Sequence, residues 1–488
     1  MSESENSTPF KGFLKALKKL RVVITGVVLA LILVIAWPLI GNNPVDYDDI
    51  QDHFKYGSIG SETANGVPYW LWKVLPALFS DKLPSEGYQS LGFIKEPGQD
   101  MPIGFSKRRV LVDRVAPNCA VCHTGLVRDT PESEPRIITT MPSNTVNLQG
   151  YIKFLCDSAK DERFTPNRIL AEMEAEGIEL NPLQKLIYRY LAIPQTRDAL
   201  LTQGHKLSFI GEQPDWGPGR VDTFNPYKSI QFNFPMEQLE DSEKIGATDF
   251  PPIWNQKPRQ GLQLHWDGDN TSVDERNLSA ALGAGVTPVT ADLERIKRVA
   301  DWLWELPAPA YPYEVNQELA TAGKTVYQNN CASCHAFGGE KVGKVTPIAE
   351  IGTDRHRLDS YTYELLSNQN TLFVDTPNRF KHFRKTNGYA NMPLDGVWLR
   401  APYLHNGSVP TLRDLLEKPE NRPQEFYRGY DVFDQEKVGF VSDVAEEKGK
   451  QYFKYETTIA GNDNGGHLYG TELSPEEKDA VVEYMKEL

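Results

Sequence analysis

One long run of apolar residues lies near the N-terminus of the chain. Residues 22–40 read VVITGVVLALILVIAWPLI and contain no charged side chain. A helix needs about 20 apolar residues to cross a bilayer, so this run predicts a transmembrane helix. Five basic residues in KGFLKALKKLR, just before it, predict a cytoplasmic N-terminus with the rest of the chain outside. The alternative is a cleaved signal peptide, but AWPLIGNNP offers no good small-residue cleavage site.

Farther along the chain, apolar residues recur with the spacing of amphipathic helices. This spacing occurs in NRILAEMEAEGIELNPLQKLIYRYLAI, in ADLERIKRVADWLW and in EVNQELATAGKTVYQNN. The C-terminal SPEEKDAVVEYMKEL opens with a capping box, in which Ser474 precedes Glu477 by three residues. Few segments alternate as strands do, and long stretches rich in Pro and Gly separate the helical ones. The pattern predicts a mainly α chain with long loops.

Composition narrows the possible partners. The chain is 40% apolar and 24% charged, which is ordinary for a globular protein, and its net charge is −14. An acidic chain without a basic stripe beyond its N-terminus has no electrostatic basis for binding nucleic acid. Its charge can attract a basic redox partner protein that carries electrons, although solubility is the simpler interpretation.

Four of the five cysteines lie in two CxxCH motifs, which are Cys119, Cys122 and His123 and then Cys331, Cys334 and His335. This spacing is that of covalent haem c attachment. The cysteines bond the two porphyrin vinyl groups, and the histidine supplies the proximal ligand of the iron. The alternative, a zinc site, would need four ligands, usually with a second knuckle. The fifth cysteine, Cys156, lies in an apolar helical stretch and is predicted to be a buried free thiol.

The motifs and the helical pattern together predict two cytochrome c-type haem domains, each with one covalent haem c. Prolines in ELPAPAYPYE separate the two domains because they end the preceding helix. We expect a cytoplasmic tail (1–21), a transmembrane anchor (22–40), a tether (41–60), an N-terminal haem c domain (61–304), a linker (305–314) and a C-terminal cytochrome c domain (315–488). The expected location is a bacterial inner membrane crossed once, with both haem domains in the periplasm.

The motifs leave the distal side of each iron open. For the second haem, Met392 in GYANMPLDGVW lies 57 residues after His335, within reach of the iron, although a core Met is equally compatible. The other candidate is His467 in GNDNGGHLYGTELS, because its glycines permit close approach to a flat cofactor. For the first haem the best candidate is His265, which would bind the iron or act as a general acid/base; the alternative is a structural histidine.

Two arginines in the same central region suit the carboxylates of a haem. Arg220 lies in WGPGRVDTFNPYK and Arg276 in SVDERNLSAALG. A guanidinium fork fits a carboxylate, so either side chain can pair with a haem propionate. A surface salt bridge is the alternative for each.

The ordered set of motifs resembles a known family. APYLHNGSVPTLRDLL is similar to the C-terminal haem domain of the bacterial dihaem cytochrome c peroxidases. With the two CxxCH motifs, RPQEFYRGY and GHLYGTELS, it resembles the rubber-oxygenase-like cytochromes c, a branch of that superfamily. The resemblance implies that His467 is the distal ligand of the second haem and that His405 lies beside a haem. It also implies a first haem with a position that is open to dioxygen or that can open.

These expectations favour a membrane-anchored periplasmic dihaem cytochrome that transfers electrons, with peroxidase-type chemistry at the N-terminal haem. The alternative is a haem-dependent dioxygenase of the rubber-oxygenase type that acts on an apolar unsaturated substrate. An anchor is a departure from an enzyme that is released to meet a polymer. A third possibility is a sensor or scaffold that merely holds haem. Two histidines on each iron would favour electron transfer, and a five-coordinate first haem would favour an enzyme.

Overall fold

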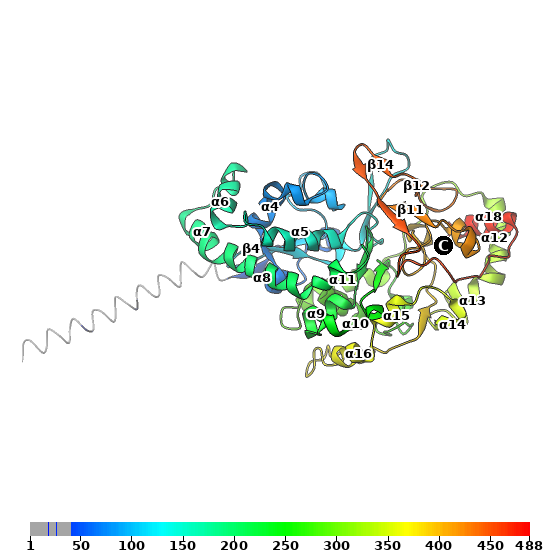
Figure 1. The fold of residues 1–488 in the computed structure, drawn as a ribbon. Coiled ribbons are helices and arrows are strands. Elements are labelled where there is room, and N and C mark those ends of the chain that lie inside the picture. The colour runs from blue at the N-terminus through cyan, green and yellow to red at the C-terminus, as the bar shows by residue number, and fades with distance from the viewer. Residues whose placement is uncertain (1–17, 19–25, 27–40) are drawn as a thin grey trace, which may run out of the picture.

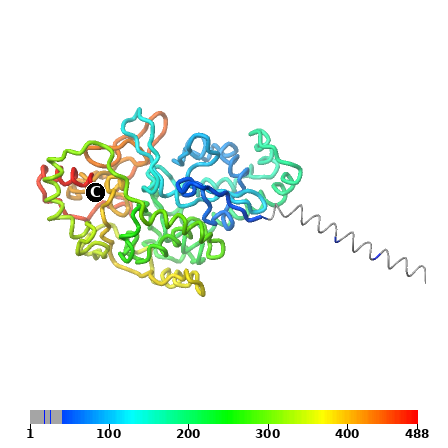
Figure 2. Tube along the Cα trace, turned by 180° about the vertical axis from the view of Figure 1, so that it is seen from behind, coloured from blue at the N-terminus to red at the C-terminus, as the bar shows by residue number. Residues whose placement is uncertain are grey.

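The computed structural model describes Lys18, Gly26 and residues 41–488. The predicted tail and anchor therefore lie outside the described residues, apart from those two positions. Within the described part, no helix combines the length and the apolar character that a membrane span requires. Figures 1 and 2 show the N-terminal part of the described chain at one end of the molecule and the C-terminal helices at the other.

An antiparallel sheet of four strands organises the N-terminal part, with the order β1–β3–β4–β2. The strands are β1 (Asn42–Pro44), β2 (Val67–Pro68), β3 (Phe105–Val110) and β4 (Val112–Pro117). The helices of this part are α4 (Tyr69–Leu78), α5 (Leu148–Lys160), α6 (Pro166–Ala175), α7 (Pro182–Ile187) and α8 (Ile193–Lys206), with one π-helical turn, η4 (Tyr188–Ala192), between the last two. Sheet and helices share one core, in which Trp72, Phe105 and Tyr151 are buried together.

The segment predicted to be a tether, residues 41–60, is folded against this sheet. Strand β1 pairs with β3, so that Asn43 lies opposite Arg109. Helix α2 (Ile50–Tyr56) follows and buries Phe54 and Tyr56. The prediction that residues 41–60 form a tether is wrong. A helix of seven residues buries only one narrow face, so it contains too few apolar residues to be recognised in the sequence.

Shorter elements fill the region up to the second motif. They are α3 (Ser61–Asn65), β5 (Thr124–Val127), β6 (Arg136–Thr139), β7 (Arg220–Asp222), α9 (Asn225–Phe232), β8 (Ala247–Asp249), α10 (Val273–Gly283) and α11 (Leu293–Glu305). Side chains cap both later helices: Ser272 accepts a bond from the backbone of Glu275, and Asp292 accepts one from Arg295. Such caps satisfy amide groups that a helix start leaves unpaired.

The C-terminal part is closed by two crossing helices, α12 (Gln317–Asn330) and α18 (Pro475–Met485). A Cβ on Gly323 would lie 1.8 Å from the carbonyl oxygen of Ala480, so only glycine permits this close crossing. The predicted capping box of Ser474 and Glu477 is present at the start of α18. The remaining elements are α13 (Ala332–His335), β9 (Val345–Pro347), α14 (Ile348–Ile351), α15 (His356–Ser360), α16 (Tyr363–Gln369), β10 (Gly388–Ala390), α17 (Leu412–Leu415), β11 (Glu425–Arg428), β12 (Phe433–Asp434), β13 (Gly439–Phe440), β14 (Glu446–Glu447), β15 (Lys450–Gln451) and β16 (Phe453–Glu456).

The fold class is mixed rather than mainly α, so that part of the prediction is corrected. The described strands are two to six residues long and form small antiparallel sheets. Strands this short cannot show the period-two alternation from which a strand is recognised. The sequence therefore overstated the helical character of the chain.

The two halves of the described chain are joined by buried ion pairs. The Arg128 guanidinium contacts Asp431 at 2.7 Å and Glu447 at 2.9 Å, and its backbone bridges to Val432. Arg428 contacts Asp249 at 2.6 Å, with both side chains almost fully buried. Because a buried charge that loses its partner costs several kcal/mol, these pairs hold the halves in one arrangement.

Candidate haem-binding sites

One cavity of about 760 Å³ connects the two CxxCH motifs. Both sets of motif residues line it, although the motifs lie in different halves of the chain. The walls are mostly apolar, with aromatic side chains such as Phe224, Tyr227 and Phe383. A large apolar cavity with a few polar groups is the usual form of a cofactor site.

The N-terminal motif is held by a short turn and a hydrogen bond. Asn118 caps the 3-10 turn η3 (Cys119–Val121) by accepting a bond from the Ala120 backbone at 3.0 Å. His123 Nδ1 lies 2.9 Å from the carbonyl oxygen of Pro251. Because a carbonyl only accepts, Nδ1 carries the proton and Nε2 keeps a free lone pair. Burial also lowers the pKa of His123 to about 4, which keeps the ring neutral and able to bind a metal.

The C-terminal motif repeats this arrangement and adds a second imidazole. His335 Nδ1 lies 2.7 Å from the carbonyl oxygen of Met392. The ring of His467 faces the ring of His335 with 6.3 Å between the centroids. Metal–nitrogen bonds of about 2.0 Å, with each ring centroid about 1.1 Å beyond its nitrogen, give about 6.2 Å for two imidazoles on one iron. The spacing of this pair therefore fits a haem iron between the rings.

A clamp of main-chain bonds holds His467 in place. The buried Arg422 guanidinium donates to the carbonyl oxygens of Asn464 at 2.5 Å, Gly466 at 2.9 Å and His467 at 3.2 Å. Gly466 has φ +70°, and a Cβ there would lie 2.3 Å from the backbone carbon of Gly352. The glycine is therefore required for the loop to approach α14. Burial lowers the pKa of His467 to about 3, so its ring is also neutral.

The N-terminal site has no such pair of rings. Among the described residues, no imidazole faces His123 at the spacing found for His335 and His467. His265 lines the same cavity, but its Nδ1 lies 2.5 Å from Asp269 Oδ1 and its ring stacks on Phe383 with 6.4 Å between centroids. A carboxylate that holds Nδ1–H leaves Nε2 of the imidazole free to accept or donate a proton.

Two other sequence candidates line the same cavity. Met392 uses its backbone carbonyl to orient His335 and is one of the residues that line the cavity. His405 is buried and stacks on Tyr389 with 3.9 Å between ring centroids. Its Nε2 has no hydrogen-bond partner within the described chain, and burial lowers its pKa to about 3. An unpaired buried nitrogen that borders a cavity is what a residue beside a cofactor would show.

The two arginine candidates have different surroundings. Arg276 lines the cavity, forms no ion pair with a described carboxylate, and donates a side-chain hydrogen bond to Asn277 Oδ1 at 3.1 Å. Burial lowers its pKa to about 10, with a further contribution from the charge of Arg259. An unpaired cation in this place suits a haem propionate.

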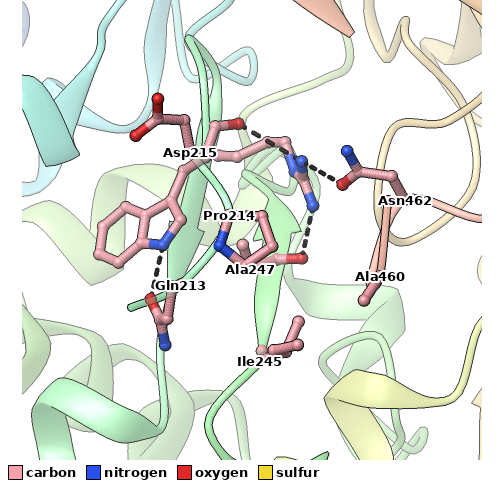
Figure 3. Close-up of a pocket in the computed structure, with 10 residues that line it drawn as sticks. Gln213, Pro214, Asp215, Ile245, Ala247, Ala460 and Asn462 are labelled. Carbon is pink, nitrogen blue, oxygen red and sulfur yellow. Dashed lines mark hydrogen bonds between the residues drawn. The ribbon is translucent and has the colours of Figure 1, made fainter. Parts of the chain in front are cut away.

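Arg220 does not line the large cavity. It is buried beside a small separate pocket, where it donates to Asn462 Oδ1 at 2.8 Å and to the carbonyl oxygen of Ala247 at 3.0 Å. Figure 3 shows Asn462 and Ala247 around this pocket. Its terminal nitrogens are therefore occupied by the protein, and neither a propionate nor a surface salt bridge describes it.

Sequence reasoning missed two residues of these sites. Arg422 lies in RPQEFYRGY, a segment used only for its resemblance, and nothing in one sequence indicates that its side chain clamps a distant loop. Asp269 follows His265 by four residues in HWDGDN. That spacing was a usable signal, because a carboxylate four residues away can orient an imidazole.

His123 and His335 each follow a CxxC pair and bond a main-chain carbonyl, and His335 also faces a second imidazole. These features define a c-type cytochrome. Residues 320–398 match the cytochrome c family, and residues 388–428 match the family described as RoxA-like, cytochrome c-like. These matches confirm the resemblance to RoxA-like cytochromes c in the C-terminal part of the chain. A cytochrome c domain implies covalently bound haem c and electron transfer.

Two relatives from Sinorhizobium fredii also align with the chain. The protein y4iM is 35% identical over 223 residues, which cover 41% of this chain and 50% of the relative. The chain thus matches about half the length of that protein. The protein y4iJ is 24% identical over 523 aligned positions, which cover 83% of this chain and 85% of the relative. Both are described as uncharacterized proteins.

Proposed function

We propose that the chain binds two covalent haem c groups that differ in axial ligation. Cys119 and Cys122 attach the first, with His123 as its only axial protein ligand. Cys331 and Cys334 attach the second, with His335 and His467 as its two ligands. The observation that carries this proposal is the 6.3 Å separation of the His335 and His467 rings, which has no counterpart at His123 among the described residues. Met392 is then an orienting residue rather than a ligand.

This difference in axial ligation gives the two sites different functions. Haem c supplies a one-electron iron couple and, where one axial position lacks a protein ligand, a place for a small oxygen-containing molecule. At the second site, protein ligands would occupy both axial positions, which suits that site to electron transfer. The chain leaves the first site accessible, with the His265–Asp269 pair on the same cavity to donate or accept protons at Nε2. The function best supported is therefore electron transfer with peroxidase-type reduction at the N-terminal site.

Arg276 and His405 support the cofactors in this proposal. Arg276 would neutralise a propionate of the first haem, because no described carboxylate pairs with it. His405 would lie against a haem and offer its unpaired Nε2 to a propionate or an ordered water. Neither side chain would bind iron.

A dioxygenase is the second candidate, and the composition of the cavity favours it. The walls near the first motif contain Phe224, Tyr227 and Phe383, which suit an apolar substrate. The RoxA-like match points in the same direction. The two candidate functions differ in what they require of His265. A peroxidase needs His265 to transfer a proton, whereas an oxygenase needs only space for its substrate and dioxygen.

The anchor and the location form a separate part of the proposal. The apolar run 22–40 and the basic residues before it support a single-pass protein of a bacterial inner membrane with periplasmic haem domains. The net charge of −14 supports a basic electron carrier as its redox partner. Replacing residues 1–40 with a cleavable signal peptide should move the holoprotein from the membrane fraction to the soluble periplasm. Membrane retention after that replacement would contradict the anchor.

Electron paramagnetic resonance of the full-length holoprotein tests the haem proposal. We expect one low-spin signal from the bis-histidine site and one high-spin signal from the site of His123, in the resting or the half-reduced state. Two low-spin signals in both states would contradict an accessible first site. The variant His265→Gln should then lower the rate of peroxide reduction without changing either signal, with His205→Gln as the matched control. An unchanged rate would favour the dioxygenase.

A further inference from the structure

The end of the molecule formed by α7, η4 and α8 carries an apolar ridge on its outer side. Leu183, Leu186, Tyr190 and Leu191 are 43%, 54%, 67% and 43% exposed. Their spacing of three, four and one residues places them along one side of a continuous helical run. The opposite side of that run is packed into the N-terminal core through Ile187, Tyr188 and Ile193. A cluster of large exposed apolar side chains on one surface marks a site of interaction.

The charge around this ridge is opposite to that of the whole chain. Residues 181–197 read NPLQKLIYRYLAIPQTR and contain three basic and no acidic side chains, although the chain has a net charge of −14. Glutamates 172, 174 and 176 lie at or next to the C-terminal end of α6, and Asp198 follows in α8, so the basic character belongs to residues 181–197 and not to their neighbours. A helix with apolar, aromatic and basic side chains fits the headgroup layer of an anionic bilayer.

The start of the described chain lies on the same end of the molecule. Asn43 of β1 pairs with Arg109 of β3. Arg109 in turn lies close to Tyr188 of η4: burial raises the pKa of Tyr188, and the Arg109 charge opposes that rise. Figures 1 and 2, seen from opposite sides, both place the first described residues at the end that α6, α7 and α8 occupy. The chain therefore reaches residues 22–40 from the end that carries the ridge.

We propose that the ridge of Leu183, Leu186, Tyr190 and Leu191 rests in the headgroup layer of the bilayer that holds the 22–40 anchor. The inference rests on the proposed anchor and adds a second membrane contact to it. The anchor keeps the ridge at high local concentration near lipid, so even a weak surface contact is occupied. Two contacts fix the orientation of the haem domains relative to the membrane, which one tether cannot do.

Depth-dependent fluorescence quenching tests this orientation in the full-length holoprotein. A single cysteine, Leu186→Cys or Tyr190→Cys, is introduced in a Cys156→Ala background and labelled with a small fluorophore. The matched controls are Val374→Cys, 48% exposed, and Tyr363→Cys on α16, 72% exposed. Each protein is placed in vesicles of phosphatidylcholine and phosphatidylglycerol with or without lipid that carries a doxyl quencher near its headgroup. The ratio of the two emissions cancels any quenching by haem.

We expect loss of emission at positions 186 and 190 and none at 363 and 374. Vesicle flotation of the same samples separates the two claims. Co-flotation without quenching at 186 and 190, or with equal quenching at all four positions, overturns the ridge contact and leaves the anchor intact. Failure to float overturns both. Efficient disulfide-linked dimers of unlabelled Leu186→Cys in the vesicles would assign the ridge to a second copy of the chain and also overturn the proposal.

Discussion

The two CxxCH segments are alike on the proximal side and different on the distal side. His123 and His335 each bond a main-chain carbonyl through Nδ1, at 2.9 and 2.7 Å. His335 then faces His467, whereas no described imidazole lies so close to His123, and His265 on the same cavity is hydrogen-bonded to Asp269. The comparison teaches that the attachment motif sets only one side of a haem. The distal side depends on loops that other parts of the chain hold in place.

Removing one attachment site should have the largest effect on this comparison. Cys119→Ala with Cys122→Ala should leave one covalent haem instead of two, because both thioethers of the first site are lost. Mass spectrometry of the purified chain and the absorbance of its pyridine haemochrome measure the loss. Cys156→Ala is the control and should keep both haems. A double variant that retains two covalent haems would contradict the attachment site.

Replacing the proposed distal ligand of the second site should change the spin state of that site. His467→Ala should convert the low-spin signal of this site to high spin, because the iron would lose one of two imidazoles. Met392→Ala should leave the signal in place, since Met392 bonds His335 through its backbone carbonyl, which the substitution keeps. If Met392→Ala removes the low-spin signal and His467→Ala does not, the axial assignment is reversed.

A single methyl group added to the loop that holds His467 should reduce the difference in axial ligation between the two sites. Gly466→Ala adds a Cβ at φ +70°, 2.3 Å from the Gly352 backbone. The left-handed backbone alone costs about 1–2 kcal/mol of unfolding free energy, and the clash should displace His467 and add a high-spin fraction. Chemical denaturation and the same resonance spectra measure both effects. Gly465→Ala is a close control, because Gly465 does not have positive φ; equal effects would show that the clash is unimportant.

The smallest expected effect is a pH dependence near the second site. The hydrogen bond to Asp354 raises the pKa of His356 above its usual value. The protonated pair therefore stabilises the fold below the ordinary histidine pKa of about 6.5, and this contribution is lost as pH rises through the raised pKa. His356→Gln should lower stability by about 0.5 kcal/mol at pH 5.5 and have less effect at pH 8.5. Thermal unfolding at both pH values checks this, with His205→Gln as control; an equal effect at both would contradict it.

The attachment motifs could be predicted from the sequence because their chemistry is local. Cys119, Cys122 and His123 are contiguous in sequence and in space, as are their C-terminal counterparts. The residues alone left His467 and Met392 as alternatives, and the resemblance favoured His467, since its partner His335 is distant in the chain. Arg220 was misplaced because its type suits a propionate, yet its bonds go to Asn462 and Ala247.

The same distinction explains the errors in the fold. Helices such as α12 and α18 have enough turns to show their period, and they were expected. The pairing of β1 with β3 joins three residues to a distant strand, which leaves no periodic trace in the sequence. Its consequence, a folded segment instead of a tether, depends on tertiary contacts that local patterns do not contain.

The shared cavity also has a consequence for how the protein is assembled. Residues of both motifs line one cavity of about 760 Å³, so the two attachment sites share their apolar surroundings. Because both motifs open into this one space, each proposed haem would form part of the wall against which the other rests. Delivery of the first cofactor should therefore favour the conformation that receives the second. Maturation would then be cooperative, and chains carrying a single cofactor should be scarce in a natural preparation and the first to be degraded.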